Sequence, residues 1–463
     1  MSSLLPKDYP LYDTVYGSEI PIEQYFVILF DKLPSKFVNN IFYDPKIVEY
    51  LLTNEGFKEE VDIFSSNRRY DLSAQSLFVN CDKKIMIRVY GNTSKDKDPL
   101  VQLDIAYDIT SGKLVEQLEL NNIKIFEGFG KLSPNKTINI TDQNGSESKI
   151  TGEKIIIATG ARSRELPFLK KDGKRIIGYR EAMTLDKQPK DIVIVGSGAI
   201  GIEFAYFYNS MGTSVTIVEY MDRIVPVEDS EISKELEKSL KKKGINILTS
   251  TEVEKAEINS SNTVDVTLKT SNGEKNIINT EIVLSAVGIK TNIENIGLED
   301  LGIKIEKDKI LVDDFYMTNV KDYYAIGDVV KGQALAHVAS AEGILCVEKI
   351  AGHDVNPLDY NNIPGCTYCS PEIASVGFTE QQAIDNGYDI KIGKFPFSAS
   401  GKAQASGKSE GFVKVIFDAK YGEWLGCHMI GEGVTDMIAE AVVGRKLETT
   451  GYEILKTVHP HPT

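Results

Sequence analysis

The sequence is poor in cysteine, histidine and tryptophan, with only five, five and one of these among its 463 residues. Five cysteines at irregular spacing do not make the disulfide framework of a small secreted protein. No apolar run approaches the roughly 18 residues that a transmembrane helix requires. The opening MSSLLPKDYP lacks the charged and apolar regions of a signal peptide. We therefore expect a cytoplasmic protein that does not bind a membrane.

Basic residues are outnumbered by acidic ones, 52 against 67, which gives a net charge of −15. An acidic surface repels phosphate backbones, so nucleic acid is not an expected partner. The remaining composition, 42% hydrophobic and 26% charged, is that of an ordinary globular protein. A chain of this length is expected to form three or four domains.

Two of the cysteines, Cys366 and Cys369, are close together in the segment CTYC. A zinc site needs four ligands, and no second cysteine pair or histidine pair lies nearby. A thioredoxin-type redox pair would lie at a strand-to-helix turn of a βαβ unit, whereas here SPEIASVG follows. We interpret these residues as two thiols beside a strand, and we expect no metal site.

Glycine is scarce in residues 1–115 and frequent in the rest of the chain. Residues 21–57 have the pattern of helices, with a helix start at Asp44-Pro45. Residues 75–109 alternate apolar and polar side chains, which predicts β-strands. We therefore expect residues 1–115 to form an α+β module of unknown fold.

The remainder of the chain follows an α/β pattern, and its clearest motif is Gly196-Ser197-Gly198-Ala199-Ile200-Gly201. This motif follows the apolar strand DIVIV and opens a helix, as in a Rossmann-type dinucleotide-binding domain. Gly196 permits a tight turn, Gly198 lets a pyrophosphate approach the backbone, and Gly201 lets the helix pack on the strand. The free N–H groups at the start of the helix would bind the phosphates.

The next strand ends in Glu219, 18 residues beyond Gly201. A carboxylate at this position can accept both ribose hydroxyls of NAD, and it repels the 2′-phosphate of NADP. Tyr220 and Met221 offer no cation for that phosphate, although Arg223 is near. The sequence thus predicts an NAD site; the alternative is a glycine-rich turn without a ligand.

Several segments of the chain together resemble one known family. They are VGSGAIGIEFA, VTIVE, SAVG, YYAIGDV, LAHVASAEG and HPHPT. Residues 116–463 resemble the pyridine nucleotide–disulfide oxidoreductases, and within them the dihydrolipoyl dehydrogenases, the flavoprotein components of 2-oxoacid dehydrogenase complexes. The resemblance implies four successive parts, namely a remnant of the FAD domain (116–185), an NAD domain (186–290), a central domain (291–354) and a dimerisation or interface domain (355–463).

The resemblance also implies contacts with the cofactors FAD and NAD. For FAD, Thr159 and Gly160 resemble a second contact, Asp328 the residue that binds the ribityl and pyrophosphate region, and Ala336 part of the loop at the flavin ring. For NAD, Glu203 resembles the acid beside the nicotinamide and Gly288 a glycine lining the site.

The resemblance further implies a catalytic residue and two partners. His461 in HPHPT resembles the general base that takes a proton from dihydrolipoamide, a task that suits an imidazole near neutral pH. The family forms homodimers, and its protein partner is the lipoyl domain of 2-oxoacid dehydrogenase complexes. We therefore expect the apolar helix around VTDMIAEAVVGRKL to lie at a dimer contact.

Three features of the family pattern are missing. No GxGxxG for the FAD pyrophosphate occurs in residues 1–117, and no CxxxxC redox pair occurs because Cys81 is the only cysteine there. Thiol–disulfide exchange needs both an attacking and a resolving sulfur. The sequence ends at Thr463, so a glutamate that would orient His461 is absent.

These departures suggest a chimera of the family with an unrelated first segment and a truncated C-terminus. We expect little or no lipoamide oxidation. The alternative is a non-catalytic NAD-binding and dimerisation module fused to an unrelated N-terminal domain.

Overall fold

The computed structural model describes residues 61–65, 75–79, 85–90, 102–105 and 123–462. The chain divides into two compact units, Met1–Glu127 and Gly128–Thr463. The predicted helices at 21–57, and also Cys81, lie outside the described residues.

The first unit contains a four-stranded antiparallel sheet in the order β1-β2-β3-β4. Its strands are β1 Val61–Ser65, β2 Gln75–Val79, β3 Ile85–Tyr90 and β4 Gln102–Ile105. The strands predicted within residues 75–109 are confirmed, because β2, β3 and β4 lie in that range. The strand β1 was not expected from the sequence.

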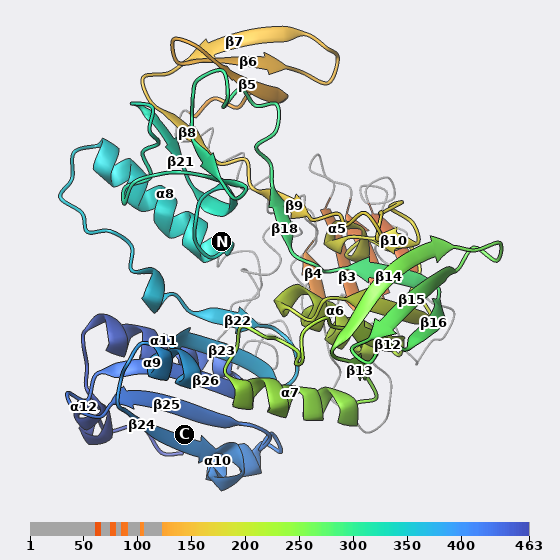
Figure 1. Ribbon diagram of the computed structural model, residues 1–463, viewed down its shortest axis with the longest axis vertical. Coiled ribbons are helices and arrows are strands. Elements are labelled where there is room, and N and C mark those ends of the chain that lie inside the picture. The colour runs from red at the N-terminus through yellow and green to blue at the C-terminus, as the bar shows by residue number, and fades with distance from the viewer. Residues whose placement is uncertain (1–60, 66–74, 80–84, 91–101, 106–122, 463) are drawn as a thin grey trace, which may run out of the picture. The chain divides into compact units, whose positions relative to one another are not determined.

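The second unit contains a five-stranded parallel sheet in the order β10-β17-β11-β12-β13, of which β10, β12 and β13 are labelled in Figure 1. Its strands are β10 Ile176–Ile177, β17 Ile282–Ser285, β11 Asp191–Val195, β12 Ser214–Val218 and β13 Asn246–Leu248. Two helices, α6 Ala199–Ser210 and α7 Ser230–Lys242, connect its strands. This is the Rossmann-type arrangement that the glycine motif predicts.

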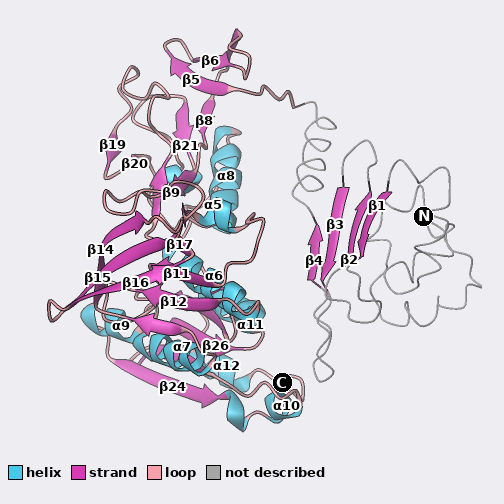
Figure 2. Cartoon of the chain, turned by 90° about the vertical axis from the view of Figure 1, so that its right-hand side faces the viewer, coloured by secondary structure: helices cyan, strands magenta, loops and turns pink. Residues whose placement is uncertain are grey.

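The central strand β11 is buried on both faces, as its uninterrupted apolar sequence predicts. Ile192 and Ile194 face the core formed with helices α6 and α7. Val193 and Val195 face the opposite core, formed with the antiparallel sheet β14-β15-β16 (Figure 2). That sheet comprises β14 Thr251–Ile258, β15 Val264–Thr270 and β16 Lys275–Thr280.

Strands of the segment 116–185 pair with later strands in two small sheets, one with a strand of 291–354 and one with a strand that crosses the boundary between residues 290 and 291. Strand β8 Ile155–Ile157 pairs in parallel with β21 Tyr323–Ala325, and β9 Ala161–Ser163 pairs with β18 Ile289–Thr291. A further antiparallel sheet comprises β5 Phe129–Ser133, β6 Thr137–Thr141 and β7 Glu147–Thr151. The long helix α8 Ala336–Ile350 follows β21 and the short turn η2 Gly327–Val329.

The last part of the chain is an antiparallel sheet in the order β22-β23-β26-β25-β24. Its strands are β22 Gly365–Thr367, β23 Glu372–Gly377, β26 Trp424–Gly431, β25 Phe412–Asp418 and β24 Ile390–Pro396. One face packs on helix α11 Val434–Lys446. Side chains of the other face, among them Ile373 and Ile430, join the core of the parallel sheet and α7.

The single tryptophan, Trp424, is buried at the start of β26. Its indole N–H donates to the carbonyl of Gly426 at 3.1 Å, and its ring lies 5.6 Å from that of Phe417. In the part of the chain that the structure describes, no helix has the length and apolar character needed to cross a bilayer.

Candidate nucleotide-binding site

The glycine motif forms the predicted turn between β11 and α6. Gly196 has a φ of +98°, and a Cβ there would lie 2.5 Å from the carbonyl oxygen of Ala286. A Cβ on Gly201 would lie 2.1 Å from the carbonyl oxygen of Gly196, so these two positions have no room for a side chain. Gly198 differs, because no atom lies within 4 Å of its potential Cβ. The backbone at Gly198 is therefore open to a ligand.

Helix α6 begins at this turn without a side-chain cap. Its N-cap residue is Gly198, which has no side chain to accept a bond from the first N–H groups. Those N–H groups and the positive end of the helix dipole are the usual binding site for an anion such as a pyrophosphate. Together with the open backbone at Gly198, they fit the phosphate groups of a dinucleotide.

Glu219 is fixed in place directly beside the turn. Its Oε2 accepts the backbone N–H of Ser197 at 2.8 Å and the hydroxyl of Ser197 at 2.6 Å. Its Oε1 accepts the backbone N–H of Met221 at 2.8 Å. The side chain is buried, and these three bonds prevent it from changing rotamer freely. The structure therefore joins the predicted acid to the glycine motif.

A cavity of about 420 Å³ lies over the turn and the end of β12. Glu219 lines the cavity together with Gly196 and Gly198. Further walls come from three segments that the sequence did not indicate; their lining residues include Phe168, Pro226, Val227, Thr251 and Val253. Such a cavity, mostly apolar with two carboxylates, Glu219 and Glu252, and open backbone groups, is typical of a nucleotide site.

Two residues on the rim of the cavity are unusually exposed for apolar side chains. Tyr220 is 73% exposed and Val227 is 80% exposed, and both line the cavity. A planar ring bound between them would cover this apolar surface. The adenine of a dinucleotide has that character.

Glu203 and Gly288 do not themselves line the cavity. Glu203 lies on α6, and its Oε1 accepts the backbone N–H of Tyr368 at 2.9 Å. Burial raises the pKa of Glu203, and the Tyr368 hydrogen bond opposes that rise. Gly288 has a φ of +97°, and its carbonyl accepts the backbone N–H of Arg164. Its neighbour Val287 lines the cavity.

Thr159 and Gly160 form a turn that Asn292 holds from the opposite segment. The Thr159 hydroxyl donates to the Asn292 carbonyl at 2.7 Å, and the Asn292 amide donates to the Thr159 carbonyl at 2.9 Å. The Asn292 N–H also donates to the Gly160 carbonyl. Asn292 has no recognisable motif in the sequence, so only the structure identifies this contact.

Asp328 lies in η2, just after β21, and Ala336 begins α8. The turn is supported by Glu342, whose Oε2 accepts the Gly327 N–H at 2.6 Å and whose Oε1 accepts the Tyr360 hydroxyl at 2.6 Å. Burial raises the pKa of Glu342, whereas its hydrogen bonds with Tyr360 and Gly327 lower it. Sequence reasoning did not identify Glu342 or Tyr360, which determine the shape of the segment around Asp328.

His461 is exposed and lies far along the chain from the glycine motif. The neighbouring His459 is the histidine that forms an ion pair, since its Nε2 lies 2.7 Å from Oε1 of Glu440 on α11. That hydrogen bond raises the pKa of His459. The structure does not bring His461 together with the nucleotide-binding residues within one chain.

All four described cysteines have free thiols: Cys346, Cys366, Cys369 and Cys427. Burial raises the pKa of both Cys369 and Cys427 to about 12. Burial also raises the pKa of Cys366. A thiol is a poor nucleophile unless it ionises, so CTYC lacks the properties of a redox pair.

Comparison with known proteins supports this description of the second unit. The family model for pyridine nucleotide-disulphide oxidoreductases matches residues 68–343, and the model for their dimerisation domain matches residues 363–463. The first match begins at residue 68, whereas the motifs alone placed the start of the resemblance at residue 116.

Individual relatives agree with these matches. A dihydrolipoyl dehydrogenase of Rhizobium etli is 50% identical over 318 residues, which cover 68% of this chain and 66% of that relative. The match thus spans just under two thirds of that protein. The dihydrolipoyl dehydrogenase of Zymomonas mobilis is 44% identical over 381 residues, 81% of each chain.

Solved structures show the same fold. LpdA from Mycobacterium tuberculosis superposes with a TM-score of 0.71 at 26% identity, covering 77% of this chain and 78% of that one. The HOCl-induced flavoprotein disulfide reductase RclA from Escherichia coli superposes with a TM-score of 0.70 at 24% identity, covering 77% and 80%, and shows the fold alone. The chain belongs to the pyridine nucleotide-disulphide oxidoreductase family, whose members use FAD and NAD.

Proposed function

We propose that this chain is a dihydrolipoyl dehydrogenase-like oxidoreductase that binds NAD in the cavity over Gly196 and Gly198. The observation that carries the proposal is Glu219, a carboxylate held at the cavity wall by three hydrogen bonds. From there it can accept hydrogen bonds from the ribose hydroxyls of NAD, and it would repel the 2′-phosphate of NADP.

The test is calorimetric titration of the full chain with NADH and with NADPH. We expect NADH to bind more tightly than NADPH, because the carboxylate meets hydroxyls in one case and a phosphate in the other. Equal affinities for NADH and NADPH would show that Glu219 does not discriminate between the two nucleotides. No binding of either nucleotide would contradict the proposed site as a whole.

The described residues fit FAD only in part. Asp328 and the Thr159-Gly160 turn are present, but residues 1–117 contain no glycine motif for the FAD pyrophosphate. We therefore derive no step through a flavin. The absorption spectrum of the purified protein decides the matter: a yellow protein contains flavin, and we expect a colourless one.

Turnover of dihydrolipoamide is expected to be low. The sequence contains no CxxxxC pair, and the two thiols of CTYC are protonated near neutral pH because burial raises their pKa values. Because no CxxxxC disulfide is present to accept the electrons of dihydrolipoamide, proton transfer to His461 alone would not oxidise this substrate. NAD⁺ reduction by dihydrolipoamide at rates comparable with those of a dihydrolipoyl dehydrogenase assayed in parallel would overturn this expectation.

These same observations favour a second candidate function, a non-catalytic NAD-binding and dimerisation module. A colourless protein that binds NADH but does not oxidise dihydrolipoamide would support it. A yellow protein that is active with dihydrolipoamide would exclude it.

The match of residues 363–463 to a dimerisation domain supports a homodimer. Side chains on and after α11 are strongly exposed, among them Val443, Leu447, Tyr452, Leu455 and Val458. A second copy of the chain would cover such a surface. A monomer mass by light scattering would contradict the dimer. Binding of a lipoyl domain, the partner that the family resemblance implies, is tested by titrating an isolated lipoylated domain into the dimer.

A further inference from the structure

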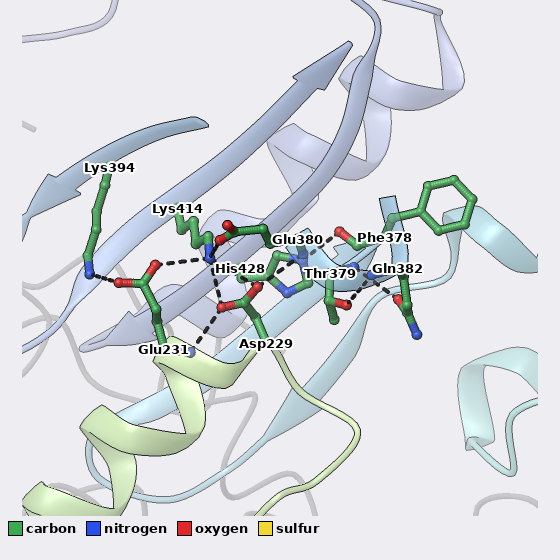
Figure 3. Close-up of polar contacts among 9 residues, drawn as sticks. All are labelled: Asp229, Glu231, Phe378, Thr379, Glu380, Gln382, Lys394, Lys414 and His428. Atoms are coloured by element: carbon green, nitrogen blue, oxygen red, sulfur yellow. Dashed lines mark hydrogen bonds and ion pairs between the residues drawn. The ribbon is translucent and has the colours of Figure 1, made fainter. Parts of the chain in front are cut away.

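A cluster of charged residues joins the nucleotide-binding domain to the dimerisation domain (Figure 3). At its centre is Lys414 on β25, whose side chain is 0% exposed. Its ammonium group lies 2.9 and 3.1 Å from the two carboxylate oxygens of Asp229, and within 2.9 Å of Glu231 and Glu380. A fully buried lysine is rare and is retained only when it is paired.

Asp229 belongs to the nucleotide-binding domain and makes three contacts. It is the N-cap of α7 and accepts the backbone N–H of Glu231 at 3.0 Å. It also accepts the backbone N–H of Glu380, the first residue of helix α9 Glu380–Asp385, at 3.1 Å. Its third bond is the ion pair with Lys414. Burial opposes ionisation of both groups. The pKa of Asp229 is nevertheless lowered, by the hydrogen bond from Lys414 and by the backbone N–H groups of Glu231 and Glu380, and the pKa of Lys414 is raised by its hydrogen bonds to Glu380, Glu231 and Asp229.

The segment directly before Asp229 forms one wall of the nucleotide cavity. Residues 220–228 connect β12 to α7, and Pro226 and Val227 within this segment line the cavity. We call residues 220–228 the wall segment. Its position depends on the contacts that hold it at each end.

Val225 shows that the wall segment does not adopt its shape by local preference. This β-branched residue has a φ of +39°, a conformation that is unfavourable for its side chain. Such a conformation persists only where the surroundings determine it. Here the Val225 N–H donates to the carbonyl of Ser197 at 3.0 Å, and the Ser233 hydroxyl donates to the carbonyl of Ile224 at 2.6 Å.

A continuous series of contacts therefore leads from the dimerisation domain to the nucleotide site. Lys414 bonds to Asp229, the residue that follows the wall segment, and Val225 of that segment bonds to Ser197 of the glycine motif. Ser197 in turn holds Glu219. Packed and hydrogen-bonded contacts of this kind can carry energetic coupling between sites.

We infer that Lys414 is a positioning residue for nucleotide binding: from the dimerisation domain, it anchors Asp229 and thereby holds the wall segment against the glycine motif. The inference rests on the proposed NAD site. It adds to that site a residue distant from it in the sequence, on a domain that does not contribute to the cavity lining.

The test is calorimetric titration of the full chain with NADH, using variants that remain folded by circular dichroism. Lys414→Met keeps the length of the side chain and removes its charge. We expect it to raise the Kd for NADH roughly 2- to 30-fold, the range that corresponds to a coupling of 0.5–2 kcal/mol. The matched control is Lys394→Met. Lys394 is the other lysine of the cluster, bonded to Glu231 at 2.6 Å but half-exposed and without contact to Asp229. This control is expected to leave the Kd unchanged.

A second variant keeps the test decisive if Lys414→Met does not fold. Asp229→Asn preserves the N-cap, because asparagine caps helices as well as aspartate, and it weakens the ion pair. In this variant we expect the Val225 amide to exchange its hydrogen faster, while amides of the central strand β11 do not change.

The outcomes separate the inference from the proposed function. If the wild type does not bind NADH, the nucleotide site itself is wrong. If the wild type binds and the folded Lys414→Met and Asp229→Asn variants bind equally well, with unchanged Val225 exchange, the positioning role is wrong. A loss of affinity in Lys394→Met equal to that in Lys414→Met would also contradict it, because the effect would then belong to the charge of the cluster.

Discussion

Ser197 donates both its backbone N–H and its hydroxyl to a single oxygen of Glu219, at 2.8 and 2.6 Å. The middle residue of a glycine turn thus holds the residue that we propose to distinguish NAD from NADP. Turn and carboxylate form one unit, so a change at either position is expected to affect the other.

Replacing Glu219 with alanine is expected to weaken NADH binding by about 1–3 kcal/mol, the usual effect of removing a buried hydrogen-bonding partner. The same change should narrow the difference between NADH and NADPH, since it also removes the charge that repels the 2′-phosphate. Calorimetric titration with both nucleotides measures both effects. As a control, Ser197→Ala keeps the backbone bond and loses only the hydroxyl bond, so its effect should be smaller. An unchanged NADH affinity in Glu219→Ala would contradict the role of the carboxylate.

Two glycines of the motif should respond differently to alanine. A Cβ on Gly201 would lie 2.1 Å from the Gly196 carbonyl, so Gly201→Ala is expected to lower the free energy of unfolding by about 1–3 kcal/mol or more. A Cβ on Gly198 meets no atom within 4 Å, so Gly198→Ala should change unfolding by no more than about 0.5 kcal/mol. Gly198→Ala should nevertheless weaken NADH binding, because the new methyl group would lie where we propose that the pyrophosphate binds.

Chemical denaturation and NADH titration of both alanine variants provide the measurement. Equal stability of the two variants would show that the packing at Gly201 is not as close as described. An NADH affinity of Gly198→Ala equal to that of the wild type would show that the pyrophosphate does not bind over Gly198.

The described cysteines are expected to react slowly with a thiol reagent in the folded protein. Burial raises the pKa of Cys369 and Cys427 to about 12 and that of Cys346 to about 11, so little thiolate exists at pH 8. A Cys81→Ser background restricts the measurement to the four described thiols. All four should react promptly after denaturation. Rapid reaction of two thiols in the native protein would indicate an accessible pair and would support a redox role for CTYC.

Glu228 is expected to make stability depend on pH. Burial raises its pKa from 4.5 to about 7, although a hydrogen bond with Ser375 opposes the rise. One of its carboxylate oxygens is buried without a partner among the described residues. The folded state therefore binds a proton that the unfolded state has already lost, and stability falls as the pH rises from about 4.5 to about 7.

Glu228→Gln should remove this contribution, since glutamine does not titrate. Urea unfolding at pH 5 and at pH 7.5 measures it: the stability difference between these pH values should be smaller in the variant than in the wild type. Glu299→Gln, at an exposed glutamate, is the control and should behave like the wild type. An identical pH dependence in wild type and Glu228→Gln would show that Glu228 ionises normally.

Much of the nucleotide domain could be predicted from the sequence because its signals are local. An apolar strand, a glycine turn and a helix occur in order, and the structure has β11, the turn and α6 at the expected residues. The helix α7 also has a local signal, since its N-cap is Asp229, a residue type that commonly begins helices.

The sequence could not indicate which distant residues complete the site. Phe168 and Thr251 line the cavity only because the β14–β16 sheet packs on one face of the parallel sheet, and no periodic pattern specifies that docking. Lys414 appears in FVKVIFD as an ordinary outward-facing polar residue of a strand. Its burial follows from the contact between two domains, which is a property of tertiary structure.

The position of Trp424 gives the protein a fluorescent reporter of one domain. Because it is the single tryptophan and lies buried between β26 and α11, its emission spectrum reports on the environment of the dimerisation domain. Selective excitation of this indole can therefore follow the unfolding of that domain on its own, while circular dichroism follows the whole chain. If the two transitions coincide, the domains unfold as one cooperative body; if the tryptophan transition occurs separately, the dimerisation domain melts as an independent unit.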